Sequence, residues 1–315
     1  MGLGYFLSSE EFTPAELIAQ ARMAEAAGFD RLWISDHFHP WNDAQGQSPF
    51  VWSVIGALSQ VSTLPVTTAV TCPTVRVHPA VIAQAAATSA VLLEGRFALG
   101  VGSGEALNEH ILGDAWPPAD IRLDMLEEAV HVIRELWAGG FVTHHGPHYT
   151  VEHARIYTLP DTPPPILMSG FGPKSIELAG RIADGFISTR PDADAIADFG
   201  KAGGTGKPTE AGYKVCWAPT HTEALDIAHE RWPNAGLPGE LDQVLPSPRH
   251  FEQASTLVTR DALAEKITCG PDIDAHVEAY RTYENAGFDR VHVNNIGPYQ
   301  KEFFDFYRTT VLPRL

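Results

Sequence analysis

The stretch Ala27-Gly28-Phe29-Asp30-Arg31-Leu32 returns near the other end of the chain as Ala286-Gly287-Phe288-Asp289-Arg290-Val291. Each copy follows a periodicity typical of an amphipathic helix and leads into an apolar run typical of a buried strand. A glycine at this place indicates the end of a helix, and the phenylalanine indicates a return to the core. A weaker copy, Ala183-Asp184-Gly185-Phe186-Ile187, lies between them. The chain is therefore predicted to repeat one strand–helix module.

Eight apolar runs, separated by helical patterns, fit this module. We expect strands at Leu3–Leu7, Arg31–Ser35, Val66–Thr71, Phe97–Val101, Ile166–Ser169, Gly185–Ser188, Tyr213–Trp217 and Arg290–Val293. The stripe of apolar residues over Ile121–Leu136 predicts a long amphipathic helix. Eight such modules predict a TIM (β/α)8 barrel of the α/β class. A doubly wound open sheet is the alternative, because periodicity does not show whether a sheet closes.

Three stretches rich in Pro, Gly, His or Asp interrupt the alternation. They cover residues 36–51, 140–165 and 233–256, and we expect them to be loops inserted at the rim of a single barrel domain spanning 1–315. The middle stretch contains two short extended runs around a turn, which predicts a β-hairpin. The third is Pro-rich and partly apolar, which is typical of a lid.

Charge and cysteine content restrict the class of partner. The chain has 315 residues and a formal net charge of −17, which disfavours nucleic acid and anionic membranes because both reward clustered Lys and Arg. The three cysteines are far apart and in no metal-ligand spacing, so a reducing compartment is expected rather than a disulfide framework. We expect neither a targeting leader nor a membrane span. These features predict a cytoplasmic protein that binds neither nucleic acid nor a membrane.

Polar side chains follow the second expected strand directly. The segment Ser35-Asp36-His37-Phe38-His39-Pro40-Trp41 gathers a carboxylate, two imidazoles and an indole where that strand ends. Barrels of this class keep their catalytic groups at the carboxyl ends of their strands. A single histidine is more often a packed or solvated side chain, but its company with Asp36 and Trp41 makes His37 a candidate catalytic residue.

Two glycine-rich loops follow the fourth and fifth expected strands. They are Gly100-Val101-Gly102-Ser103-Gly104-Glu105 and Ser169-Gly170-Phe171-Gly172-Pro173, and each leads toward a helix whose free amides attract anions. The first lacks the spacing of a dinucleotide fingerprint. Ordinary tight turns are the alternative for both loops. Together on one rim, they would suit an extended cofactor that bears a phosphate.

Two further groups are not assigned to catalysis. Cys72 is interpreted as a small buried residue rather than a nucleophile, since no helix start or basic neighbour is placed to activate it. The run His144-His145-Gly146-Pro147-His148 suggests a metal site. However, consecutive imidazoles at a hairpin turn point apart, and no carboxylate or thiolate completes a set of ligands. We therefore expect no metal.

Together these residues resemble the luciferase-like monooxygenase superfamily. Within it they are similar to the deazaflavin (coenzyme F420)-dependent oxidoreductases of the glucose-6-phosphate dehydrogenase-like group. The similarity is carried by Ser35–Trp41, by Val70–Thr74 with His78–Gln84 after it, by Gly102–Glu109 and by Ala183–Phe186. It spans most of the chain and weakens in the third insertion and the last quarter. The resemblance implies a TIM barrel that binds the coenzyme at its carboxyl rim, and a homodimer.

The same resemblance implies which residues hold the coenzyme. Contacts with the deazaflavin ring would come from Asp36, from Cys72 and from the Ala69-Val70 peptide, at the place where the family has a non-prolyl cis bond. Ring and ribityl contacts match Ser103, Gly104, Glu105 and Asn108, and the phosphate loop matches Ser169, Gly170, Phe171 and Gly172.

A deazaflavin carries hydride and reacts poorly with oxygen, so the protein must supply proton handling and geometry. Oxidation of an alcohol needs a base, which would be His37, and the neighbouring Asp36 would favour its imidazolium form. Glu105, on the opposite flank of the ring system, would stabilise or protonate the reduced ring, while Trp41 would hold the substrate carbon near the hydride acceptor. The alternatives are an FMN-dependent monooxygenase and a catalytically silent flavin-binding barrel.

Phosphate recognition departs from that of the sugar-phosphate enzymes. Those enzymes grip phosphate with lysines and an arginine, one lysine lying just after the sixth strand, whereas this chain has Thr189-Arg190-Pro191-Asp192 there. Thr189, Arg190 and Lys266 are the substrate-binding candidates, although Asp192 would repel a phosphate. We expect the substrate to be a sugar, a sugar phosphate or another alcohol.

Overall fold

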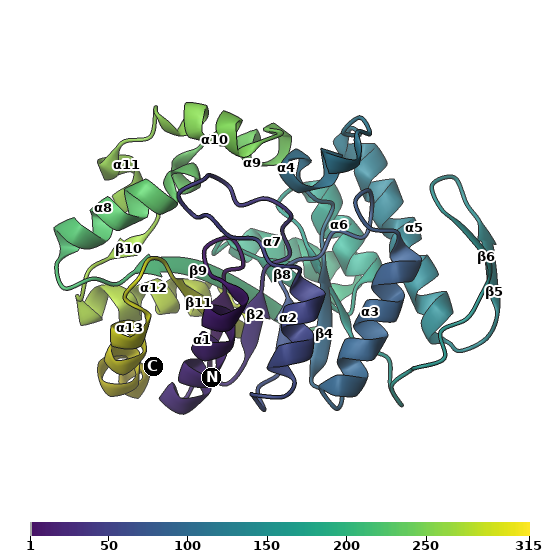
Figure 1. The fold of residues 1–315 in the computed structure, drawn as a ribbon, viewed down its shortest axis with the longest axis horizontal. Coiled ribbons are helices and arrows are strands. Elements are labelled where there is room, and N and C mark those ends of the chain that lie inside the picture. Colours follow the sequence, from purple (N-terminus) through teal and green to yellow (C-terminus); the bar gives the residue numbers. More distant parts are fainter. Residues whose placement is uncertain (1) are drawn as a thin grey trace.

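The computed structural model describes residues 2–315 as a ring of parallel strands surrounded by helices (Figure 1). The strands are β1 (Leu3–Leu7), β2 (Leu32–Ile34), β3 (Val66–Thr68), β4 (Phe97–Val101), β5 (Val142–His145), β6 (Thr150–Ala154), β7 (Ile166–Ser169), β8 (Gly185–Ser188), β9 (Thr209–Cys216), β10 (Thr268–Cys269) and β11 (Arg290–Asn295). The helices are α1 (Pro14–Ala27), α2 (Val51–Leu58), α3 (Pro79–Leu92), α4 (Ala106–Glu109), α5 (Ala119–Trp137), α6 (Pro173–Ile182), α7 (Ala193–Phe199), α8 (His221–Arg231), α9 (Leu241–Val244), α10 (Pro248–Ser255), α11 (Arg260–Ala264), α12 (Ile273–Ala286) and α13 (Gln300–Phe306).

The main sheet closes on itself. Its neighbours run β1, β2, β3, β4, β7, β8, β9, β11 and back to β1, and all of these pairs are parallel. Short β10 pairs with β9 outside this ring and was not expected from the sequence. The eight expected strands therefore form a TIM barrel, and the open-sheet alternative is wrong. The boundaries differ most at the seventh strand, which begins at Thr209 rather than Tyr213.

The repeated helix–strand junction has the geometry that its glycine implied. Gly28 ends α1 with φ 97° and Gly287 ends α12 with φ 100°, both in the left-handed region. Phe29 and Phe288 are buried directly after them. Among residues 2–315, none of the helices combines the length and the apolar character that a membrane span requires.

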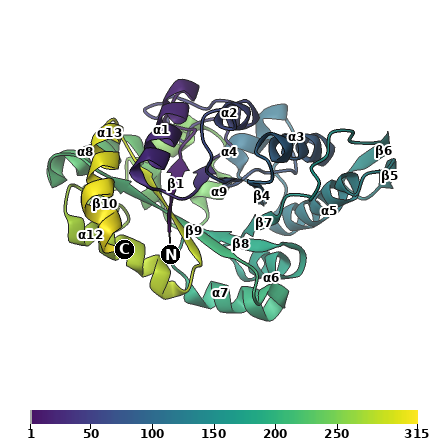
Figure 2. The same cartoon turned by 90° about the horizontal axis from the view of Figure 1, so that it is seen from below.

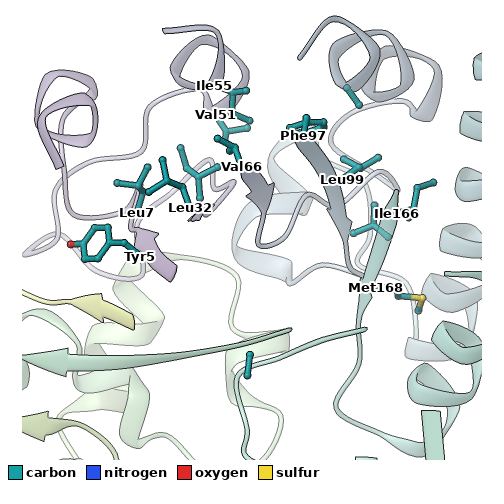
Figure 3. Packing of buried hydrophobic residues seen from close by; sticks show 14 of the residues in the cluster. Tyr5, Leu7, Leu32, Val51, Ile55, Val66, Phe97, Leu99, Ile166 and Met168 are labelled. Carbon is teal, nitrogen blue, oxygen red and sulfur yellow. The ribbon is translucent and has the colours of Figure 1, made fainter. Parts of the chain in front are cut away.

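The main hydrophobic core lies between the barrel and its helices. Leu7, Leu32 and Val66 face outward from adjacent strands, beside Val51 and Ile55 of α2 (Figure 3). A second, smaller apolar cluster lies inside the ring and consists of Phe6, Trp33, Leu167 and Ile187, with Ala69 and Val70 packed against it. This inner cluster forms a floor beneath the carboxyl ends of the strands, where the loops carry the candidate site residues.

The three inserted stretches differ in structure. Residues 36–50 form an irregular loop before α2, and the second stretch contains the expected antiparallel hairpin β5–β6 at the edge of the molecule (Figures 1 and 2). The third forms α9 and α10 rather than an open loop. Helix α9 contacts α4, and Gln243 accepts a hydrogen bond from Arg122 of α5 (Nη2–Oε1 3.2 Å). The third insertion therefore covers part of the rim.

Candidate active site

His37 lies at the centre of a polar cluster formed by the loops after β1, β2 and β4. Its Nε2 is 3.2 Å from Oε1 of Glu10 and 3.7 Å from Oε1 of Glu105. The His37 ring also packs against Trp41, with ring centroids 5.1 Å apart. The His37 side chain is 11% exposed, so an approaching ligand can still reach it. The structure brings His37 and Trp41, from the loop after β2, together with Glu105, from the loop after β4.

Asn108 sets the orientation of the histidine. Its side-chain Oδ1 accepts hydrogen bonds from the backbone amides of Phe38 (2.8 Å) and His39 (2.9 Å), which fixes the amide so that Nδ2 faces the other way. That Nδ2 donates to Nδ1 of His37 (2.9 Å) and to Glu105. With Nδ1 accepting, the hydrogen of a neutral His37 is on Nε2, directed at the two carboxylates.

Glu10 is a member of this cluster that sequence reasoning missed. It is buried after the end of β1, and its Oε2 accepts hydrogen bonds from Ser8 (2.8 Å) and Ser35 (2.7 Å). Burial alone acts to raise the pKa of Glu10, but the charge on His37 and the serine hydrogen bonds hold it below its ordinary value. Glu10 is thus a fixed carboxylate beside Nε2. Its sequence position, directly after the first strand, is the signal that could have identified it.

Asp36 and Glu105 lie differently from what was expected of the neighbours of His37. Asp36 does not serve the imidazole, because its carboxylate is held by Thr71 and Arg76 (both 2.9 Å), and Glu10 occupies the place proposed for it. Glu105 was expected across a ring system from His37. A separation of 3.7 Å leaves no room for an aromatic ring between the two side chains, which needs about 7 Å at van der Waals contact.

Arg76 joins two buried carboxylates on the neighbouring part of the rim. Its guanidinium is 2.9 Å from Oδ1 of Asp36 and 3.4 Å from Oε1 of Glu109, and its backbone amide donates to Oε2 of Glu109 (2.8 Å). The side chains of Arg76, Asp36 and Glu109 are 7%, 2% and 1% exposed. Burial raises the pKa of Glu109 to about 7, against the opposing effect of Arg76. One guanidinium therefore has to compensate two carboxylates.

The loops after β3 and β4 approach each other closely. The peptide bond between Ala69 and Val70 is cis, as the resemblance implied. A Cβ at Gly104, whose φ is 78°, would lie 2.5 Å from Sγ of Cys72, and a Cβ at Gly102 would lie 2.7 Å from Val70. Ser103 lies between the two glycines and is partly exposed. Burial, with Glu109 nearby, raises the pKa of the Cys72 thiol, which agrees with its interpretation as an inert buried residue.

The loop after β7 leads into the first turn of α6. Ser169 and Gly170 end the strand, Phe171 is exposed, and the backbone amide of Gly172 donates to the hydroxyl of Ser175 (3.1 Å). The first amides of a helix have no partner within the helix and point outward. The loop after β7 can therefore receive an anion at the carboxyl rim.

The three substrate candidates are not brought together. Thr189 and Arg190 are exposed after β8, and the Arg190 guanidinium stacks on Phe171 at 5.1 Å. Lys266 is exposed after α11, and within residues 2–315 no hydrogen bond or ion pair joins it to the His37 cluster. Asp192 caps α7 by accepting from the amides of residues 194 and 195. Its carboxylate is therefore already engaged.

Lys214 is a second residue that sequence reasoning missed. It stands on β9 with its Nζ 4.4 Å from the Trp232 ring centroid and 5.9 Å from that of Phe6, a member of the inner floor. Burial lowers its pKa, although Glu10 and Glu11 act to raise it. Among residues 2–315 its ammonium is in no hydrogen bond or ion pair. The sequence signal was a lysine that interrupts the apolar run from Ala211 to Trp217.

Known proteins resemble this chain over its whole length. The F420-dependent glucose-6-phosphate dehydrogenase of Microbacterium testaceum (strain StLB037) is 37% identical over 325 residues, which cover 99% of this chain and 96% of that protein. An F420-dependent hydroxymycolic acid dehydrogenase of Mycobacterium tuberculosis (strain ATCC 25618 / H37Rv) is 35% identical over 324 residues, covering 100% and 88%.

A solved structure with the same architecture supports this relationship. An F420-dependent secondary alcohol dehydrogenase, in complex with an F420–acetone adduct, has a TM-score of 0.91 and 30% identity, over 99% of this chain and 98% of that one. Residues 1–290 match the luciferase-like monooxygenase family. A closed parallel barrel, its polar carboxyl rim and matches of this extent lead to one assignment: the chain belongs to the luciferase-like monooxygenase family.

Proposed function

We propose that this protein is an F420-dependent dehydrogenase that transfers hydride between the deazaflavin and an alcohol or carbonyl carbon. The observation that carries the proposal is its full-length similarity, at 30–37% identity, to three proteins whose names share this coenzyme. The same three differ in substrate: a sugar phosphate, a hydroxylated fatty acid and a secondary alcohol. The coenzyme is therefore the conserved part of the proposal and the substrate the variable part.

The residues at the carboxyl rim fit such a coenzyme. Gly102 and Gly104 let the loop after β4 pack closely against Val70 and Cys72, next to the cis peptide that the resemblance places against the ring. The amides at the start of α6, after Gly172, would hold a phosphate. When bound, the deazaflavin supplies a carbon that accepts or returns a hydride. Glu105 would have to turn away from His37 to contact the ring.

His37 is the group we assign to proton transfer. Donation to a carbonyl oxygen needs the imidazolium form of His37, which gives the hydrogen on Nε2, between Glu10 and Glu105, and keeps the hydrogen on Nδ1. In the oxidative direction Nε2 must first lose that hydrogen. The tautomer with its hydrogen on Nδ1 has an acceptor available, since the carbonyl oxygen of His39 lies 3.2 Å from Nδ1. Glu10 then stabilises the imidazolium formed when Nε2 takes the hydroxyl proton.

The substrate would lie over Trp41, within reach of Lys214. The Trp41 ring is fixed between His37 and Phe251 of α10, with centroid distances of 5.1 and 5.0 Å. Lys214 offers ammonium hydrogens that no group within residues 2–315 accepts, and the charge of Glu10, the carboxylate next to His37, acts on its pKa. These two side chains favour a substrate with an apolar face next to the reacting carbon and an oxygen on the side of β9. Sugars and other polyols satisfy both requirements.

The coenzyme and the reaction can be tested together. Purified protein is titrated with oxidised F420 and separately with FMN, and absorbance at the deazaflavin band is followed with sugars, sugar phosphates and secondary alcohols. We expect F420 to bind and to be reduced by at least one alcohol without oxygen consumption. Tight FMN binding with oxygen uptake and no response to F420 would instead establish the FMN-dependent monooxygenase alternative. Binding of either coenzyme without turnover on any substrate would favour the silent barrel.

We also propose that the protein is a cytoplasmic homodimer, as the family resemblance implies. A small-molecule substrate agrees with relatives that are dehydrogenases. Light scattering after size-exclusion chromatography is expected to give twice the 34.3 kDa chain mass. A monomer at micromolar concentration would contradict the proposed assembly and leave the coenzyme assignment intact.

A further inference from the structure

We propose that His131, Glu135 and His144 form a binding site for one zinc-class transition-metal ion, placed between α5 and the β5–β6 hairpin. One ligand atom from each residue lies within 4.8 Å of the others. The site is on the outer surface of the barrel, where the hairpin runs beside α5 (Figures 1 and 2). It is separate from the His37 cluster and does not depend on the proposed reaction.

From the sequence we expected no metal at the hairpin histidines, for two reasons, and the first of them agrees with the structure. His144 and His145 do point apart, because Nε2 of His145 is paired with Glu152 at 3.0 Å. The second reason was that no carboxylate or thiolate completes a set of ligands. The structure places a second imidazole and a carboxylate from α5 beside His144. These two belong to positions 131 and 135, an i, i+4 pair on one face of the helix.

The distances are close to those of a three-ligand site. Nε2 of His131 is 3.4 Å from Oε1 of Glu135, and Nδ1 of His144 is 3.8 Å from Oε2 of the same carboxylate. Ligand atoms around a tetrahedral zinc ion, each about 2.0–2.1 Å from the metal, are about 3.4 Å apart. Glu135 therefore lies between the two imidazoles at nearly the required spacing. The His131 side chain is 61% exposed and can rotate to close the remaining distance.

A second carboxylate orients His144 for this role. Glu128 accepts hydrogen bonds from Nε2 of His144 (3.0 Å) and from the backbone amides of His148 (3.1 Å) and Tyr149 (2.9 Å). Partial burial acts to raise the pKa of Glu128, but these hydrogen bonds lower it below its ordinary value. With its hydrogen on Nε2, His144 presents the lone pair of Nδ1 toward Glu135. Metal-bound histidines are oriented by a carboxylate in the same way.

The ligand types indicate which ions would bind. Two imidazole nitrogens and one carboxylate oxygen suit zinc, nickel or cobalt, whereas magnesium and calcium prefer oxygen ligands throughout. A fourth position would be completed by water. A bound ion would connect the last turns of α5 to the first strand of the hairpin, and so would stabilise a segment that lies at the edge of the fold.

The test uses the whole chain, stripped with a chelator and titrated with zinc chloride in a calorimeter. Wild type is compared with His131→Gln, His144→Gln and Glu128→Gln, and His145→Gln is the matched control on the same hairpin. We expect one zinc per chain in wild type and in the control, and loss of that equivalent in the first two variants. Glu128→Gln is expected to retain the site with roughly 10- to 100-fold weaker affinity.

Cobalt and thermal unfolding provide independent readouts. Co²⁺ in this site should give the visible absorption of a four-coordinate complex, and excess zinc should raise the Tm of wild type and of the control but not that of His131→Gln or His144→Gln. His131→Gln is at an exposed position and keeps the test decisive if another variant fails to fold. The proposal is overturned if wild type binds no zinc stoichiometrically, or if the control loses zinc as fully as His144→Gln.

Discussion

The charged side chains on the two sides of the barrel rim differ in how they are buried and paired. On the side of β2 to β4, Asp36, Arg76 and Glu109 are almost fully buried, and each is bonded to another of the three. On the side of β8 to β9, Arg190 rests on an aromatic ring and Lys214 has no carboxylate in hydrogen-bonding contact within the described residues. The first side is a fixed network, and the second keeps its cations available to a ligand.

Under the proposed function, the first side would hold the coenzyme and the second would select the substrate. This buried network resists loss of its cation, because removal of Arg76 leaves two carboxylates uncompensated. An unpaired cation can be replaced without that penalty. The relatives share a coenzyme name and differ in substrate name, as such a division of the rim would produce.

His37 lies between the two sides, and its removal is expected to have the largest effect. His37→Ala should reduce kcat by roughly 10²–10⁴, since it removes the group that we propose for proton transfer. Coenzyme affinity should change little, because the fixed network does not include His37. Steady-state kinetics with a fluorescence titration of F420 measures both quantities. Equal losses in turnover and coenzyme affinity would show that His37 has a structural role.

Arg76→Met tests the fixed side. It leaves Asp36 and Glu109 buried without their cation, which should lower the free energy of unfolding by about 3–5 kcal/mol. Denaturant unfolding gives this value. Arg181→Met is the control, because Arg181 pairs with Glu127 on the exposed surface and should cost at most about 1 kcal/mol. Similar losses in the two variants would contradict the contrast between network and surface.

The pH dependence of stability tests the role of Glu109 in the same buried network. Its pKa of about 7 in the folded protein lies above the unfolded value near 4.5, so its contribution to stability is fully present below pH 4.5 and is lost as the pH rises through 7. Glu109→Gln lacks this loss. Between pH 5 and 8 the variant should gain about 1–3 kcal/mol relative to wild type. Parallel curves of stability against pH for the two proteins would contradict this assignment.

Lys214→Met should have the smallest effect and should act on the substrate alone. We expect KM for an oxygen-rich substrate to rise about tenfold, in line with loss of one charged hydrogen bond, while stability and F420 affinity stay near wild type. Lys214→Arg keeps the charge and should recover part of the affinity. If instead the F420 affinity falls and KM does not change, Lys214 belongs to the coenzyme side.

The sequence predicted the barrel because its signals are local. Glycine caps, apolar strands and helical periodicity each appear within a few residues, and the junctions at Gly28 and Gly287 have the predicted conformation. Short β10 was missed because two residues give no periodicity. Closure of the sheet depends on pairing between strands that are far apart in the sequence, so it could not be derived from local patterns.

The candidate site was predictable where residues share a loop. His37 and Trp41 are four positions apart, and Glu105 and Asn108 lie three apart on the next loop. The partners that we assigned to these residues differ from those in the structure where the true partner lies far away in the sequence. Glu10 comes from the loop after another strand and lies in place of Asp36 beside His37, and His131 and Glu135 of α5 approach His144 from outside the hairpin. Such pairings depend on tertiary packing, which no window of sequence contains.

The placement of Glu10 has a consequence for biosynthesis. It follows β1, whose two neighbours in the ring are β2 and the last strand, β11. Once residues 1–289 have left the ribosome, every side chain around His37 has been synthesised. Strand β1 still lacks its hydrogen-bonded neighbour β11 at that point. Competence for proton transfer should therefore arise only when the final segment emerges and docks. Nascent chains stalled before that point would be inert, however well the earlier modules had folded.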